Sequence, residues 1–415
     1  MAGGEVFARD EWRQHGSIVP ACAAGIMLVA AHNYALGAMI PALEAEFHWS
    51  RAAITLGHFF PSMAAIIMAP LVGMAIDRYG VRRIALAGVP AFCACIALLS
   101  QTGRSITSWW ALYFLLGVAS MFIFPTVWTA AINARFDRNR GKALAVTLAG
   151  TGITAMVMPT LATALIAQLG WRGAYVAIAL ICFVIVYPLV YFLFARDEAR
   201  LRHDMPNHAA AQKPLRSELL SKSFLLLAGA AFAFGLAGSA LTTNAVPILL
   251  DGGLSPMAAA NIAGWIGLGS ICGRLAGGVL LDHFDGRHVA AWSMVMPAIS
   301  IAILLGVDGS LFATSVACFL LGLTAGTEYD ACAYLAARHF GIRRFGALFG
   351  AIGGLLLFAN GIAPLLSNQV YDVTRSYDAV LWAILPILAL TAVLFLALGP
   401  YPADPDGAEA ADDTP

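Results

Sequence analysis

Long hydrophobic runs alternate with short charged or turn-rich breaks along this chain. A run of about twenty apolar residues is long enough to cross the hydrocarbon core of a bilayer as an α-helix. The pattern predicts twelve membrane helices with approximate bounds 17–40, 53–76, 82–102, 107–133, 142–168, 172–195, 223–250, 257–281, 288–307, 310–337, 346–371 and 379–399. We therefore expect an all-α, polytopic membrane protein.

The basic residues predict how these helices are oriented. If both termini lie on one side, the segments on that side hold 19 of the 24 Lys and Arg residues. The opposite loops then hold only Arg51, Arg104, Arg172 and Arg375, and Arg274 completes the total. Cytoplasmic loops carry an excess of Lys and Arg, so we expect both termini in the cytoplasm.

One long polar segment, 196–222, divides the predicted helices six and six. We expect an N-terminal six-helix bundle at 17–195, a cytoplasmic linker at 196–222 and a C-terminal six-helix bundle at 223–399. A polar cytoplasmic segment, 1–16, precedes them. The tail 400–415 is acidic and rich in Pro and Ala, a composition that predicts disorder.

The two halves repeat at an offset of 205 residues. The sequence FLLG at 114–117 returns at 319–322, and Ser50 returns as Ser255. The other matches are Gly73 with Gly278, Asp77 with Asp282, and Gly141 with Gly346. Matches at the same place in each half indicate a duplicated six-helix unit. Two parallel halves with a site between them are a transporter architecture.

The composition excludes several classes of function. Only 12% of the residues are charged, and the 24 acidic and 24 basic residues cancel, so nucleic acid is not an expected partner. The seven cysteines lie in apolar segments without metal-ligand spacing, which predicts buried, reduced packing residues. We expect no metal and no cofactor.

Arg274 is the only Lys or Arg that cannot be placed in a loop or at a helix end. It lies in an otherwise uncharged stretch of eighteen residues, Gly264–Leu281. Eight residues separate it from Asp282, roughly 12 Å along a helix. A cation at that depth is costly, so it pairs with an acid, faces a wet cavity or holds an anionic ligand. We favour the anion-binding role over an arginine that only braces helices.

The segment 73–83 (GMAIDRYGVRR) resembles the loop between helices two and three of the major facilitator superfamily. A degenerate copy follows at 278–287 (GVLLDHFDGR), where Asp285 intrudes. In that family the loop acts as a cytoplasmic latch between the halves. The gating residues that the resemblance implies are Asp77, Arg78, Arg82 and Asp282.

Finer features resemble the monocarboxylate and oxalate:formate branch of the family. Arg274 stands where those proteins keep a substrate-facing arginine, between Gly273 and Gly277. The segment 136–150 is similar in part to that branch's helix-five signature, and 326–341 (GTEYDACAYLAARHFG) resembles bacterial importers of organic acids. Ser270 replaces the aspartate of animal carriers, and the first helix lacks their acidic entry motif. Both departures argue against simple lactate or pyruvate specificity.

Glu328 and Asp330 are the two acids well inside a predicted helix, at a depth similar to that of Arg274. At 100° per residue they point about 200° apart, so only one is expected to face the central cavity. We favour Glu328 and keep Asp330, or neither acid, as alternatives. A substrate carboxylate that takes over the guanidinium of Arg274 leaves two anions close together unless the acid binds a proton. This arrangement predicts proton:carboxylate symport.

Other polar residues inside helices complete the candidate site. The predicted substrate-binding set is Arg274, His32, Asn33, Tyr34, Asn244, Tyr329 and Asn360, and the predicted proton-coupling pair is Glu328 and Asp330. His32 could carry a proton, bind substrate, or be a neutral core histidine bonded to a carbonyl. For Asn244 and Asn360 the alternative is hydrogen bonding between helices. Tyr329 offers aromatic surface.

The sequence therefore predicts a secondary transporter of the inner membrane that imports an organic monocarboxylate, an aromatic acid being one candidate, by proton symport and alternating access. Its partners would be a small carboxylate, a proton and the lipid bilayer, and it would work as a monomer. An exchanger or exporter of the same fold is the alternative; the stretch around Pro159 lacks the Gly-Pro signature of exporters. ATP use is not expected, because no Gly-x-x-x-x-Gly-Lys-Ser/Thr loop is present. A membrane enzyme is disfavoured because Glu328 and Asp330 are too few acids and point apart, and a sensor because the polar linker is too short for a signalling domain.

Overall fold

The computed structural model describes residues 11–136, 139–194, 219–306 and 310–401, and within them not the side chains of 69, 70, 73, 77 and 342–346. No strand occurs in this described part. The helices of the first half are α2 (Ile18–Phe47), α3 (Arg51–Tyr79), α4 (Val81–Leu98), α5 (Ile106–Ser120), α6 (Pro125–Asn133), α7 (Arg140–Leu148) and α8 (Gly150–Leu193). Those of the second half are α10 (Lys222–Thr243), α11 (Ala245–Asp251), α12 (Pro256–Ala263), α13 (Trp265–His283), α14 (Gly286–Ser293), α15 (Val295–Gly306), α16 (Leu311–Thr374) and α17 (Asp378–Leu396).

Eleven helical stretches of the described chain are long and apolar enough to cross a membrane. One of them, Arg140–Leu193, has 54 residues, far more than one crossing needs. It is broken at Gly170, whose φ of 68° lies in the left-handed region that glycine adopts without strain. Counting its two parts separately gives twelve crossings. The predicted all-α, polytopic fold is confirmed.

The internal repeat is visible in the local backbone. Ser50 and Ser255 both cap a helix, with φ of −66° in each case and ψ of 150° and 153°. Each side chain accepts a hydrogen bond from the backbone N–H three residues on. Two residues earlier, His48 and Gly253 both have positive φ, 55° and 85°. The same turn therefore begins the second crossing of each half.

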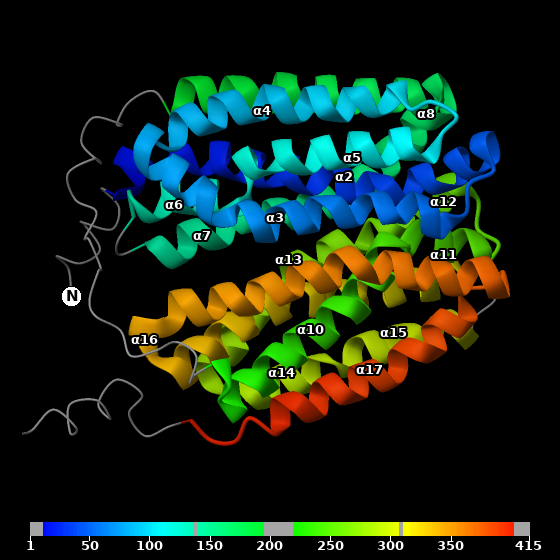
Figure 1. The fold of residues 1–415 in the computed structure, drawn as a ribbon. Helices are drawn as coiled ribbons and strands as arrows, with labels where there is room; N and C mark the ends of the chain where they lie inside the picture. Colours follow the sequence, from blue (N-terminus) through cyan, green and yellow to red (C-terminus); the bar gives the residue numbers. More distant parts are fainter. Residues whose placement is uncertain (1–10, 137–138, 195–218, 307–309, 402–415) are drawn as a thin grey trace, which may run out of the picture.

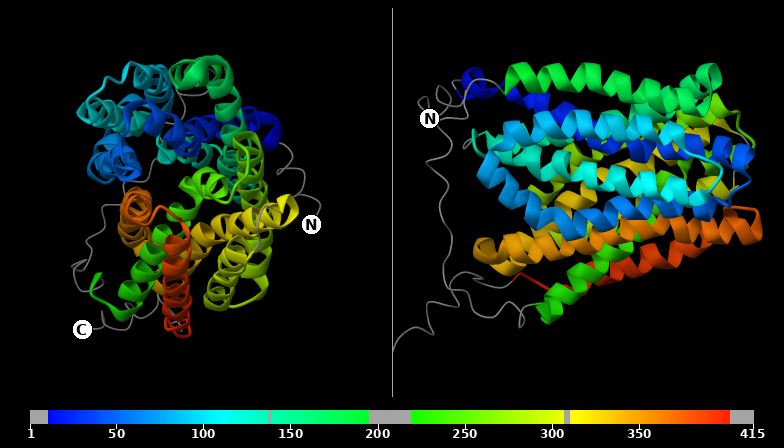
Figure 2. Two further views of the ribbon diagram at one scale, coloured as in Figure 1. Left: turned by 90° about the vertical axis from the view of Figure 1, so that its right-hand side faces the viewer. Right: turned by 45° about the horizontal axis from the view of Figure 1, so that its top comes forward.

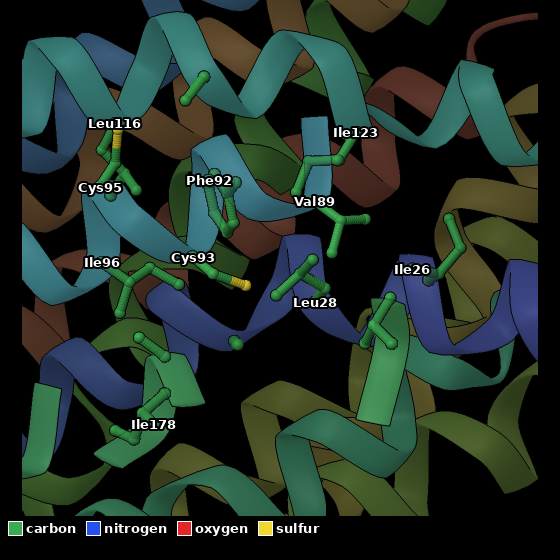
Figure 3. Packing of buried hydrophobic residues seen from close by; sticks show 14 of the residues in the cluster. Ile26, Leu28, Val89, Phe92, Cys93, Cys95, Ile96, Leu116, Ile123 and Ile178 are labelled. Atoms are coloured by element: carbon green, nitrogen blue, oxygen red, sulfur yellow. The ribbon is translucent and has the colours of Figure 1, made fainter. Parts of the chain in front are cut away.

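Each half has its own hydrophobic core. In the described residues, the buried members of one cluster all come from the first half, and those of two further clusters all come from the second. Figure 3 shows part of the first cluster, where Leu28, Phe92 and Ile178 come from three different helices. Figures 1 and 2 show the two groups of helices lying against each other. Separate cores let each half move as one body.

The two ends of the bundle differ. We call the end at which α2 and α10 begin and α17 finishes the terminal end, and the end that holds Ser50, Gly170 and Arg375 the loop end; they are the left and right ends in Figure 1. The described hydrogen bonds that involve a side chain and join the two halves all lie toward the loop end. The halves are thus fastened together on one side of the molecule.

We call the hydrogen bonds that join the halves at the loop end the loop-end lock, and Asp372 of α16 lies at its centre. Its two carboxylate oxygens accept hydrogen bonds from the backbone N–H groups of Arg51 (3.1 Å) and Ala52 (3.0 Å), so a residue of one half caps a helix of the other. An anion at a helix N-terminus is favoured by the helix dipole and by the unpaired N–H groups there. The side chain of Arg51 donates to Glu44 at 2.9 Å and lies 3.9 Å over the ring of Tyr371.

A buried amide network extends the lock inward. The Arg51 guanidinium donates to the hydroxyl of Tyr377 (3.3 Å), which donates to Oδ1 of Asn368 (2.8 Å). Nδ2 of Asn368 donates to Oδ1 of Asn244 (2.9 Å) and lies 3.4 Å from the Thr55 hydroxyl of the other half. These bonds satisfy polar groups that are costly to leave unpaired when buried.

Candidate substrate-binding site

One face of α13 runs along the boundary between the halves. Gly267, Ile271, Arg274 and Gly278 share this face, because steps of four, three and four residues return to nearly the same direction on a helix. A Cβ atom at Gly267 would collide with Gly152 and Met156 of the first half, whereas one at Gly278 would meet no atom within 4 Å. Arg274 therefore lies where the contact between the halves gives way to open space.

Arg274 pairs with Asp330 of α16. Nη1 of Arg274 donates to Oδ1 at 2.9 Å and to Oδ2 at 3.2 Å. The side chains are 13% and 30% exposed, so the pair is sheltered but reachable. Among the described residues, Nε and Nη2 of Arg274 have no hydrogen-bond partner. The edge of the guanidinium formed by Nε and Nη2 is thus free to bind a second carboxylate.

Close packing of α13 against α16 fixes this pair. A Cβ atom at Gly273 would collide with the carbonyl of Leu323, and one at Gly326 with the carbonyl of Ser270. The Thr327 hydroxyl donates to the carbonyl of Gly273 at 2.9 Å. Small residues let membrane helices approach this closely, and the short separation holds the two charged side chains at a defined height.

Two tyrosines lie within electrostatic range of the ion pair. Tyr34 of α2 lies near enough for the charge of Arg274 to act on its hydroxyl, although it belongs to the other half. The hydroxyl of Tyr329 is influenced by both Arg274 and Asp330, and its ring meets Phe349 edge to face at 5.7 Å. The structure brings together four of the predicted residues: Arg274, Asp330, Tyr34 and Tyr329.

Glu328 does not pair with Arg274, so the preference for it over Asp330 is wrong. The predicted divergence of the two acids is correct, because Asp330 faces α13 and Glu328 faces α14. Glu328 is fully buried, and its Oε2 lies 2.8 Å from the Ser293 hydroxyl. Sequence spacing gives the angle between two side chains of a helix but not which neighbour each one meets.

His32 and Asn33 are not seen in contact with the ion pair. Nδ1 of His32 bonds to the carbonyl of Val29 at 2.9 Å, and the ring meets Phe92 and His58 within the first half. His32 points almost opposite to Tyr34 around α2, because two residues correspond to about 200°. This geometry matches the alternative of a core histidine. Asn33 has a buried Oδ1 with no described partner.

Asn244 and Asn360 contact neighbouring helices. Asn244 is fully buried, and its amide donates to Ala240 and Ser367 and accepts from Asn368, so both of its donors are used within the second half. The backbone carbonyl of Asn360 accepts from Ser239 of α10 at 2.8 Å. These contacts match the alternative of hydrogen bonding between helices, and a role in binding substrate stays a prediction.

The predicted gating residues lie at the terminal end. The side chain of Asp77 is outside the described residues. Arg78 lies beside the ring of Tyr79, and Arg82 donates to the carbonyl of Tyr191 in its own half at 3.4 Å. Asp282 is exposed, with no hydrogen bond or ion pair to another described residue. Their gating role stays a prediction.

Asp285, the intruding residue of the second copy, caps α14. It accepts from the backbone N–H of Arg287 at 3.1 Å and pairs with the Arg287 side chain at 2.9 Å. Burial raises the pKa of this carboxyl, but hydrogen bonds from Arg287 and Tyr401 and the charge of Arg287 outweigh burial and lower the pKa. Asp285 therefore stays ionised and closes the turn between α13 and α14.

Sequence reasoning missed the loop-end lock. Arg51 and Asp372 are 321 residues apart, and both fall in segments that the hydrophobic pattern marks only as breaks. The available signal was that Arg51 is one of four basic residues in the sparsely charged loops. The described chain holds no group of three or more His, Cys, Asp or Glu side chains placed to bind a metal ion.

Comparison with known proteins gives the family. A model of the Major Facilitator Superfamily matches residues 22–276 and, in an overlapping second match, 227–414. The chain is 26% identical over 385 residues to a gallate transporter of Pseudomonas putida, covering 80% of this chain and 83% of that protein. It is 29% identical over 252 residues to an uncharacterised transporter of the family from Yersinia pestis (strain Pestoides F), covering 57% and 60%.

Solved structures share the fold at low identity. A point mutant of the nucleoside transporter NupG superposes with a TM-score of 0.74 at 12% identity, covering 92% of this chain and all of that one. A bacterial homologue of the lysosomal transporter Spinster, inward-facing and unoccupied, gives a TM-score of 0.69 at 14% identity, covering 92% and 96%. The family model covers more than half of the chain, so the chain belongs to the Major Facilitator Superfamily and is a membrane transporter, not an enzyme.

Proposed function

We propose that this transporter carries an organic acid whose carboxylate binds Arg274. The supporting observation is the position of Arg274, on the α13 face between the halves and at the level where their contact ends. A buried cation in a membrane protein needs an anionic partner, and Asp330 supplies one through a single guanidinium nitrogen. The edge formed by Nε and Nη2 offers a bidentate site for a substrate carboxylate.

An aromatic acid is the substrate class that the surroundings favour. Tyr34 and Tyr329 lie within electrostatic range of the ion pair, Tyr34 in the first half and Tyr329 in the second. Aromatic rings stack or meet edge to face with other rings, which adds about 0.5–1.5 kcal/mol per pair beyond the area buried. The gallate transporter relative carries a hydroxylated aromatic acid, which fits the same chemistry.

Proton coupling is assigned to Asp330. When a substrate carboxylate binds Arg274, the carboxylate of Asp330 loses part of its stabilisation and faces a second anion. A proton on Asp330 removes that repulsion, so substrate and proton bind together. The empty carrier keeps the Arg274–Asp330 pair and has no net charge at the site. It can therefore return without substrate, which favours symport over obligatory exchange.

Orientation completes the proposal. The excess of basic residues at the terminal end supports a cytoplasmic location for that end. The described conformation, fastened at the loop end, is then the inward-facing one. We propose import across the inner membrane by a monomer; export or exchange of an organic anion by the same fold is the alternative.

Uptake into proteoliposomes tests this function. Wild type and Arg274→Ala would be compared under an inward proton gradient with benzoate-type, hydroxylated aromatic and aliphatic carboxylates. We expect accumulation by wild type and roughly a tenfold to hundredfold loss in the mutant, since a hydrogen bond to a charged group contributes about 1.5–3 kcal/mol. Lys222→Ala, a change far from the site, is the control. Uptake by Arg274→Ala at the wild-type rate would contradict the proposal.

A further inference from the structure

Glu328 is a buried acid that the proposed cycle does not use. It lies two residues from Asp330 on α16 but contacts α14, through Oε2 and the Ser293 hydroxyl. Its Oε1 is buried without a hydrogen-bond partner among the described residues. A carboxylate in this position would be held by one hydroxyl only, which is too little to replace its hydration.

The hydrogen bonds of Ser293 indicate where a proton lies. Its Oγ is 2.7 Å from the carbonyl of Ala290 and 2.8 Å from Oε2 of Glu328. Both distances are those of ordinary two-centre O–H···O bonds, and a serine hydroxyl has one hydrogen to donate. The carbonyl of Ala290 can only accept. Both contacts are hydrogen bonds when Ser293 donates to Ala290 and Glu328 donates its own proton to Ser293.

No described cation stabilises an ionised Glu328. Arg274 binds Asp330, and Arg287 binds Asp285. Cys332 lies one turn along α16 and is a buried thiol. It supplies no positive charge to an ionised Glu328. The other titratable residues on elements that pack against this part of α16 are Cys272, Asp282 and His283 of α13, His288 of α14, Lys222 of α10 and Asp378 of α17. None forms a described hydrogen bond or ion pair with Glu328, and α15 contains no titratable residue.

We infer that Glu328 is a proton-binding site, separate from the Arg274–Asp330 pair, that is occupied in this conformation. Its neutral carboxyl joins α16 to α14, and the Thr324 hydroxyl adds a bond of 2.9 Å to the carbonyl of Ser293. Both helices belong to the second half, so a movement of one half against the other leaves this contact unchanged. The proton on Glu328 therefore stays bound during transport and stabilises the half itself.

Ser293 lies at the edge of a mainly apolar cavity of the second half. It lines this cavity of about 460 Å³ between α13, α14, α15 and α16, together with Thr324, Thr327 and the exposed Trp292. The cavity adjoins the face of α13 that holds Gly273 and Gly277, not the face that holds Arg274. The contact between Glu328 and Ser293 therefore lies away from the proposed substrate site.

Infrared spectroscopy of the full-length protein in lipid nanodiscs at pH 7 tests the inference directly. We expect the wild-type spectrum to contain the C=O stretch of a protonated carboxyl group, which Glu328→Gln removes and Asp330→Asn, the matched control on the same helix, retains. Ser293→Ala should shift that band, because it removes the acceptor of the carboxyl proton. Absence of a wild-type minus Glu328→Gln difference would overturn the inference.

The pH dependence of thermal unfolding is a second, independent test of whether Glu328 is protonated in the native state. The unfolded chain releases a glutamate proton above about pH 4.3, whereas the native state is inferred to keep it. The native state then binds one more proton, so rising pH disfavours it by up to about tenfold per unit in the unfolding constant. Glu328→Gln keeps the donor to Ser293 and lacks this proton. We expect its apparent Tm to rise relative to wild type between pH 5 and 8; a constant difference would contradict the inference.

Transport distinguishes this inference from the proposed function. Glu328→Gln should keep gradient-driven accumulation within about twofold of wild type, while Asp330→Asn should lose it. Accumulation lost in Glu328→Gln with exchange retained would mean that this proton leaves in each cycle, and the inference would fail. Accumulation retained in Asp330→Asn would instead refute the coupling assigned to Asp330 and leave the spectroscopic result for Glu328 unaffected.

Discussion

The boundary between the halves is built differently at its two ends. At the loop end, Asp372 caps a helix of the opposite half, and Arg51, Tyr377 and Asn368 extend that contact inward. Toward the terminal end, Cβ atoms at Gly278 of α13 and Gly350 of α16 would meet no atom within 4 Å. The closed side thus depends on polar groups that water can also satisfy, and separating them costs far less than breaking an apolar core. A seal of this kind can both close and open.

The largest effect should come from a side chain placed inside the closed contact. Gly267→Leu would collide with the backbone of Gly152 and Met156 and hold the halves apart. Overpacking costs about 1–3 kcal/mol, so closure should be disfavoured roughly tenfold to a hundredfold, with a similar fall in uptake. The control is Gly278→Leu, on the same face of α13 but opposite open space.

A thiol reagent that cannot cross membranes measures this closure. Thr160→Cys, in a background without the seven native cysteines, lies toward the loop end, where Thr160 donates to Asn261 of the other half at 2.9 Å. Labelling should rise in Gly267→Leu and stay unchanged in Gly278→Leu. Equal labelling and uptake in both variants would show that contact at Gly267 does not determine closure.

Removing the cap from α3 should have a smaller effect. Asp372→Ala leaves the N–H groups of Arg51 and Ala52 without their carboxylate. Loss of a helix cap costs about 0.5–2 kcal/mol, so the population open at the loop end should rise about tenfold. The same labelling assay measures it. Asp378→Ala, an exposed acid at the same end, is the control, and a matching response from it would point to a general charge effect instead.

Tyr377→Phe should give the smallest shift. It removes the hydroxyl that links Arg51 to Asn368 and keeps the aromatic ring, which lies 4.5 Å from that of Tyr371. A net hydrogen bond contributes about 0.5–1.5 kcal/mol, so labelling should increase about twofold to tenfold. Tyr401→Phe removes a tyrosine hydroxyl at the terminal end and should have no effect. A response larger than that of Asp372→Ala would place the main closing force in the amide network.

The sequence was sufficient for features that depend on the bilayer. The twelve crossings follow from the length of apolar runs, and the depth of Arg274 follows from its distance to the next polar residue. The repeat could be recognised because residues such as Ser50 and Ser255 recur at one offset, and both cap helices in the structure. These inferences use only local chain length and spacing.

Contacts between distant segments could not be read in this way. The spacing of Glu328 and Asp330 gave their angular separation, but which of them meets Arg274 depends on how α13, packed through Gly273, is rotated against α16. His32 shows the same limit, since a polar residue in a helix does not reveal which neighbour it faces. The contact between Arg51 and Asp372 required the two halves to be placed against each other.

The charges of Arg274 and Asp330 determine how the membrane voltage acts on transport in the proposed cycle. In the proposed cycle the empty site carries one positive and one negative charge, which sum to zero. The loaded site carries Arg274, the substrate carboxylate and a protonated Asp330, which also sum to zero. The conformational change of the empty carrier and that of the loaded carrier therefore move no net charge through the electric field. Each charge alone would gain or lose about 2.3 kcal/mol per 100 mV. Uptake of a monocarboxylate would follow the pH difference alone, whereas a dicarboxylate would have to move against an inside-negative potential.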